Sequence, residues 1–149
     1  MAPFDDITEP AIAALVERFY SKARRDPMIG PVFSAAVEDW DTHLRKLCDF
    51  WSSVMLTTGR YKGRPIPAHV RINQRQEGTI EPKHFTEWLT LFEATAKDLF
   101  SPDLAASFVE KARRIAESLK LGFAFHSPTP EIWANLPPRA IRQTTVKAG

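Results

Sequence analysis

Apolar side chains recur along this chain every three or four residues, which is the spacing of one face of an α-helix. A first helix is predicted to begin near Thr8, a residue type that caps helices. Its apolar face comprises Ile12, Leu15, Val16, Phe19, Tyr20 and Ala23. The spacing predicts a longer helix over about Glu38–Thr57, which Gly59 ends. The apolar face of this helix comprises Trp40, His43, Leu44, Leu47, Phe50, Trp51 and Val54.

Proline and glycine divide the rest of the chain into elements. The stretch "RDPMIGPVF" interrupts the first helix and leaves Phe33 to pack. Two further helices are predicted to begin at Pro82 and at Ser101–Pro102. Their apolar faces comprise Phe85, Trp88, Leu89, Phe92 and Leu99 in the first, and Leu104, Phe108, Ile115 and Leu119 in the second. No stretch has the alternation of a strand, so the pattern predicts an all-α fold.

The stretch "YKGRPIPAHVRI", between the helices at Glu38 and Pro82, carries two prolines just before His69. Pro65 and Pro67 cannot donate hydrogen bonds inside a helix, so we expect a loop with at most one short helix. A stiff backbone that presents one imidazole suits a metal ligand, because neutral imidazole binds iron, zinc and copper.

The periodicity disappears after Phe125. Four of the 12 prolines lie in the last 24 residues. We therefore divide the chain into a helical domain, 1–125, and a Pro-rich C-terminal extension, 126–149. The composition of the extension predicts a disordered or surface-bound segment. A tail without function and a docking segment built on Ile132, Trp133 and Leu136 both fit this composition.

Composition narrows the classes of protein. A chain of 149 residues, with 44% hydrophobic and 26% charged residues, is typical of one soluble globular domain. The net charge of +2 is too small to argue for nucleic acid. Cys48 is the one cysteine, so no intrachain disulfide can form, and we expect a cytoplasmic protein. We find neither a secretory signal nor an apolar run of about 18 residues that could span a membrane.

Three polar side chains lie on apolar helix faces: Tyr20, His43 and Trp88. Each one alone can be a core residue whose polar atom a neighbour satisfies, since burying an unpaired polar group costs about 1–3 kcal/mol. Together they can form the polar spot of an otherwise apolar pocket, which is the usual character of a small-ligand site.

The histidines do not form a zinc site in the sequence. His43 and Cys48 do not share a helix face, His84 is expected to be exposed near a helix start, and His126 lies in the extension. One histidine is enough for haem, because the porphyrin supplies the other four ligands. Haem propionates need cationic neighbours, and Arg60 to His84 holds six basic residues, including Arg71, against two acidic ones. A solvated basic loop explains the same charges.

The motifs "FYSKARRDPMIGPVF", "W..HLRKLCDFW", "Y.G.P...H" and "HFTEWLTLF" resemble the group III truncated haemoglobins over about Ile7–Phe125. The resemblance implies a truncated globin fold, a two-over-two helical sandwich around haem b. It implies that His69 is the proximal iron ligand and that Tyr20, His43 and Trp88 form the distal pocket. The residues that it places around the haem are Phe19, Phe33, Leu47, Phe50 and Trp51, and the basic segment adds Arg71.

The resemblance implies a protein that binds O2, NO or CO on ferrous iron. NO dioxygenation or a peroxidase-like reaction would need a separate reductase, because the sequence has no Gly-rich dinucleotide turn. Whether the protein is an enzyme stays open at this point. A non-catalytic gas carrier or sensor is one alternative, and a haem-free helical interaction module is another.

Overall fold

The computed structural model describes residues 4–75 and 80–125 of the chain. The extension at 126–149 lies outside the described residues, so the predicted domain boundary stays a prediction. The described chain forms six helices, namely α1 (Glu9–Ala23), α2 (Gly30–Ala36), α3 (Trp40–Leu56), α4 (Pro65–Arg75), α5 (Pro82–Leu99) and α6 (Pro102–Phe125). The all-α prediction is confirmed, since the described residues add only one isolated β-bridge, between Phe4 and Phe100.

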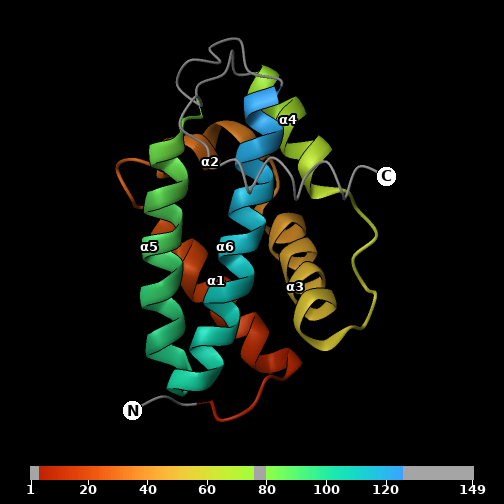
Figure 1. Ribbon diagram of the computed structural model, residues 1–149, viewed down its shortest axis with the longest axis vertical. Helices are drawn as coiled ribbons and strands as arrows, with labels where there is room; N and C mark the ends of the chain where they lie inside the picture. The colour runs from red at the N-terminus through yellow and green to blue at the C-terminus, as the bar shows by residue number, and fades with distance from the viewer. Residues whose placement is uncertain (1–3, 76–79, 126–149) are drawn as a thin grey trace.

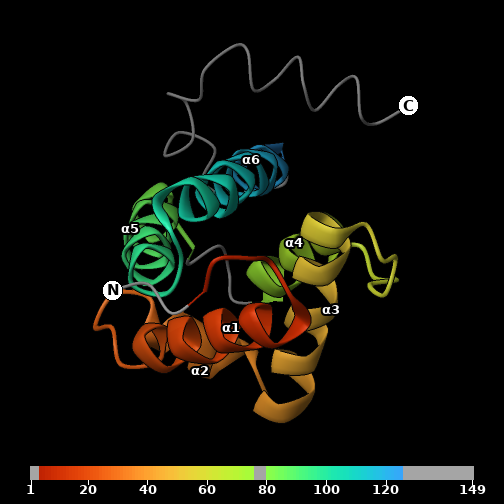
Figure 2. The same cartoon turned by 90° about the horizontal axis from the view of Figure 1, so that it is seen from below.

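The helices lie in two layers (Figures 1 and 2). Figure 2 shows α5 and α6 side by side in one layer, with α1 and α3 crossing in the other. Helix α1 packs against both α3 and α5, while α4 packs against α6. This is the two-over-two arrangement that the resemblance implied. No helix within the described ranges has both the length and the apolar character that a membrane crossing requires.

Local capping explains where most helices begin. The Thr8 side chain accepts a hydrogen bond from the Ala11 amide (3.2 Å), as predicted for the start of α1. Helix α5 begins at Pro82 with a capping box between Glu81 and His84. The end of α3 differs from the prediction: Thr57, not Gly59, caps the helix in the left-handed conformation, with a φ of 58°.

Helix α4 is longer than predicted. It runs for 11 residues from Pro65, where we expected a loop with at most a short helix. Pro65 and Pro67 occupy its first turn, where backbone amides have no acceptor inside the helix. The two prolines therefore remove no hydrogen bond from the helix. The first such bond is made by the Ala68 amide, which donates to the Arg64 carbonyl at 3.2 Å. His69 consequently stands on a regular helix and not on a turn.

The core lies where the two layers meet. Phe19, Phe92 and Phe108 are each at most 2% exposed, and the Trp51 ring stacks on Phe92 with centroids 5.1 Å apart. Helix α3 departs from the predicted pattern of burial. Of its predicted apolar face only Trp51 is fully buried, because several of the other residues border a cavity.

Candidate functional site

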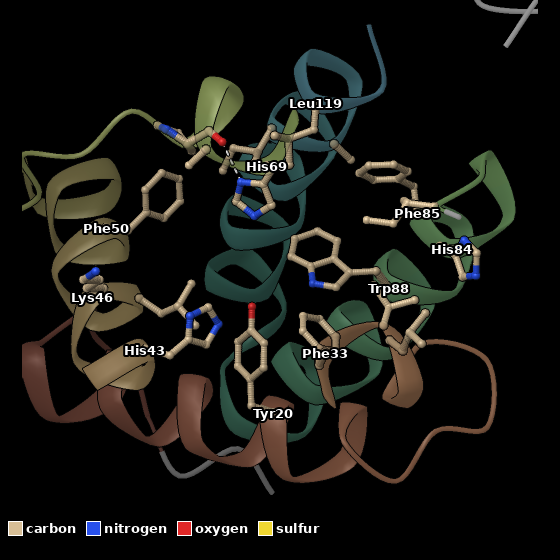
Figure 3. Close-up of a pocket in the computed structure, with 18 of the residues that line it drawn as sticks. Tyr20, Phe33, His43, Lys46, Phe50, His69, His84, Phe85, Trp88 and Leu119 are labelled. Carbon is tan, nitrogen blue, oxygen red and sulfur yellow. Dashed lines mark hydrogen bonds between the residues drawn. The ribbon is translucent and has the colours of Figure 1, made fainter. Parts of the chain in front are cut away.

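A cavity of about 360 Å³ lies between the two layers, under α4. That volume is within the range of roughly 300–1,000 Å³ typical of small-ligand pockets. Eight of the ten residues predicted for the site line it: Tyr20, Phe33, His43, Leu47, Phe50, Trp51, His69 and Trp88. They come from five helices, so only the tertiary structure brings them together (Figure 3).

His69 faces this cavity from α4. Its Nδ1 lies 2.6 Å from the carbonyl oxygen of Pro65, one helical turn earlier. A carbonyl can only accept, so Nδ1 carries the proton and donates, which leaves the lone pair on Nε2. Figure 3 shows this side of the ring pointing into the cavity. His69 is exposed to the space of this cavity, whose walls are mainly apolar.

Burial lowers the pKa of His69, and the bond to the Pro65 carbonyl opposes this shift in part. A lowered pKa keeps the imidazole neutral near pH 7, which is the form that binds metals. The structure therefore presents a neutral imidazole in a defined tautomer, with its free nitrogen aimed at the cavity.

Tyr20 faces the cavity from α1, on the side opposite His69 (Figure 3). Three aromatic rings meet the phenol ring edge on: Phe19 at 4.8 Å, Phe33 at 5.4 Å and His43 at 5.7 Å between centroids. Burial raises the pKa of Tyr20, and a hydrogen bond with the Trp88 side chain lowers it in part. The hydroxyl thus keeps its proton and acts as a neutral donor.

Trp88 lines the cavity from α5. Its ring stacks on Phe92, with centroids 5.3 Å apart and planes at 17°, and meets Phe19 edge on at 5.6 Å. These two contacts fix the indole plane. The one polar atom of the side chain, the indole N–H, can only donate.

His43 lines the cavity from α3, and its Nε2 is buried without a hydrogen-bond partner among the described residues. Burial lowers its pKa most, and the nearby His69 and Lys46 lower it further, so the ring is neutral near pH 7. An unsatisfied buried nitrogen costs about 1–3 kcal/mol. The expectation of a core histidine with a satisfying neighbour therefore does not hold at this atom.

Two predicted residues lie outside the lining. Phe19 is 1% exposed and packs behind Tyr20 and Trp88, where it supports the polar side chains without facing the cavity. Arg71 is exposed on α4 and does not line the cavity. Its predicted contact with haem propionates stays a prediction.

Among the lining residues that were not predicted, three carry polar side chains: Lys46, Tyr61 and His84. Lys46 follows His43 by three residues, so helical spacing already placed it on the same face of α3. His84 was expected to be exposed and is half-buried; its Nδ1 accepts the Glu81 amide at 2.8 Å in the capping box. Tyr61 packs edge on against Phe50, at 5.3 Å between ring centroids.

The residues present fit a haem. The walls are mainly apolar and aromatic, one neutral imidazole offers a lone pair, and three polar side chains lie across from it. The buried Nε2 of His43 also calls for a partner that the described residues do not provide.

Comparison with known proteins gives a consistent result. No protein-family model matches the chain. The chain is similar to the group 3 truncated hemoglobin ctb of Campylobacter jejuni, with 32% identity over 118 residues; the match covers 76% of this chain and 88% of that protein. It is also similar to the crystal structure of group III truncated hemoglobin from Campylobacter jejuni, with a TM-score of 0.66 and 26% identity over 93% of this chain and 98% of that one.

Proposed function

Because the chain belongs to the group III truncated haemoglobins, we propose that it binds haem b through His69 and takes up O2, NO or CO in the cavity. The observation that carries the proposal is the pair of opposed faces around the cavity. His69 offers its Nε2 lone pair on one side, and Tyr20, His43 and Trp88 lie on the other.

Haem iron, when bound, supplies the position at which a diatomic gas attaches. The chain contributes the surroundings of that position. The Tyr20 hydroxyl and the Trp88 indole are neutral donors that need no protonation near pH 7. Both would favour a gas ligand that draws partial negative charge, as O2 would, over CO, which would carry less. The aromatic walls exclude water and thereby strengthen these hydrogen bonds.

A pocket rich in donors releases O2 slowly, so we favour chemistry on O2 and NO over bulk storage or transport. NO dioxygenation combines NO, O2 and one electron to give nitrate. A peroxidase-like reaction is the related possibility, and in either case the electrons come from a separate reductase. A gas carrier or sensor without turnover is the second candidate function.

Replacing His69 tests the proposal directly. His69→Ala should lose haem, or keep a site that added imidazole restores, as measured by the Soret band and the ferrous spectrum. His84→Gln is the matched control, since it removes another imidazole that lines the cavity while glutamine can replace it in the capping box. Tightly held haem with an unchanged ferrous spectrum in His69→Ala would contradict the assignment.

Two simple measurements separate the alternatives. A haem-free interaction module would purify colourless and without a Soret band, even after expression with ample haem. An NO dioxygenase would consume NO over many turnovers when a reductase and nicotinamide nucleotide are supplied, whereas a carrier or sensor would stop after one equivalent.

A further inference from the structure

Trp40 lies between an exposed cation and the unsatisfied histidine of the cavity. The guanidinium carbon of Arg24 is 4.2 Å from the centroid of the Trp40 ring. That ring meets His43 edge on, with centroids 5.5 Å apart and planes at 87°. We infer that Arg24 and Trp40 are positioning residues that hold the His43 imidazole in the cavity wall. This inference rests on the proposed function only for its consequence on ligand binding.

Ring packing is what orients His43. Its Nε2 has no hydrogen-bond partner among the described residues, so this atom does not anchor the ring. The ring is instead enclosed between two aromatic side chains, Trp40 and Tyr20, and it meets both nearly at right angles. Edge-to-face pairs are worth only about 0.5–1.5 kcal/mol beyond the area that they bury. The stiffness of Trp40 therefore decides how firmly His43 is held.

The backbone under Trp40 is fixed by the start of α3. Asp39 caps this helix: its Oδ1 accepts the Thr42 amide at 3.3 Å and its Oδ2 accepts the Thr42 hydroxyl at 2.7 Å. The His43 amide donates to the Asp39 carbonyl at 3.0 Å. Trp40 and His43 are thus three residues apart in one capped turn, which places both side chains on the same face.

The backbone under Arg24 is fixed as well. Its amide closes α1 by donating to the Tyr20 carbonyl at 3.0 Å. Gly30 approaches this turn so closely that an added Cβ would lie 2.7 Å from the Arg24 carbonyl oxygen. The Gly30 amide is held in turn by the Asp26 carbonyl at 2.8 Å. The planar guanidinium of an arginine suits stacking on an aromatic face, as it does over Trp40.

These contacts form one continuous series from the surface to the cavity. The Arg24 charge is attracted to the face of the Trp40 ring and limits its tilt. The Trp40 edge then limits the swing of His43, which lines the cavity where a ligand would enter or bind. Loss of the Arg24 charge should leave the fold intact, because the side chain is exposed, and should loosen His43.

Arg24→Gln removes the charge and keeps most of the side-chain length. Arg24→Lys keeps a cation. Arg25→Gln is the matched control, since Arg25 is also exposed and bonds Ser21 Oγ at 3.2 Å, on the same turn of the chain. Each full-length variant is measured in the ferrous CO form by NMR, through the nuclear Overhauser effects between the His43 and Trp40 rings, and by flash photolysis, through the CO association rate.

Arg24→Gln should weaken the His43–Trp40 effects and speed CO association by about two- to fivefold, equivalent to about 0.5–1 kcal/mol at 1.36 kcal/mol per decade. Arg24→Lys should restore much of both signals, and Arg25→Gln should change neither. The thermal unfolding midpoints of Arg24→Gln and Arg25→Gln should be equal. Equal midpoints would show that the changes in Arg24→Gln come from the position of His43 and not from a loss of stability.

The inference is overturned if Arg24→Gln leaves both the His43–Trp40 nuclear Overhauser effects and the CO association rate unchanged. It is also overturned if Arg25→Gln changes them equally. Failure of the proposed function has a different signature, because the unsubstituted chain would then bind no haem. The nuclear Overhauser effects between His43 and Trp40 can still be measured in the haem-free chain. Their absence from the unsubstituted chain would also overturn the inference.

Discussion

Replacing Tyr20 by phenylalanine removes one hydroxyl from the cavity and little else. Tyr20 is 6% exposed, and its ring contacts with Phe19, Phe33 and His43 involve the carbon ring, which phenylalanine keeps. Any change in ligand binding therefore reports the hydroxyl and not a packing defect.

The magnitude follows from the hydrogen bonds around that hydroxyl. A hydrogen bond to a charged acceptor is worth about 1.5–3 kcal/mol, or roughly 10- to 150-fold in a rate. The Trp88 side chain, hydrogen-bonded to Tyr20 in the structure, is freed by the substitution and can donate to the ligand in its place. We therefore expect the lower part of that range, an O2 release about 10- to 30-fold faster, equivalent to about 1.5–2 kcal/mol.

The ligand CO serves as an internal reference, because it carries less charge and should be released less than about threefold faster. Stopped-flow displacement of O2 by CO, and of CO by NO, measures the two rates. Tyr61→Phe is the matched control, since the other tyrosine of the chain also lines the cavity and packs on Phe50. Equal acceleration of both ligands would refute the hydrogen bond and indicate a lost steric barrier. Unchanged rates would mean that Tyr20 does not contact the ligand.

Two further predictions concern α3. His43→Leu should change the ferric visible spectrum or its pH dependence, because the substitution removes the unsatisfied Nε2 from the cavity; an unchanged spectrum and an unchanged CO association rate would reduce His43 to a packing residue. The Asp39 carboxylate has a pKa below its ordinary 3.8, chiefly because the Thr42 side chain and amide hydrogen-bond to it, so the folded state favours the charged form. Its contribution to stability is therefore fully present above about pH 5 and is lost as the pH falls through the lowered pKa. Urea unfolding of Asp39→Ala should show the largest deficit near neutral pH and a smaller one near pH 3; a deficit independent of pH would contradict this account.

Local sequence determined most of the helices. The Thr8 cap, the prolines at 82 and 102 and the spacing of apolar residues act within one or two turns, so they can be interpreted without knowledge of the fold. The same reasoning explains the error at α4. We treated Pro65 and Pro67 as helix breakers, whereas both occupy a first turn that needs no amide donors. The hydrogen bond between His69 and Pro65 is equally local, since it spans one turn of that helix.

The tertiary structure decided which polar side chains meet. Helical spacing assigns a residue to a face, but whether the face meets another helix or a cavity depends on packing between segments distant in the chain. Phe19 and Tyr20 are neighbours on one helix, yet the first is core and the second faces the cavity. Likewise, no local pattern places Arg24 over Trp40, because this contact exists only once the end of α1 meets the start of α3. The same holds for His43 Nε2, which has no partner among the residues that the structure describes.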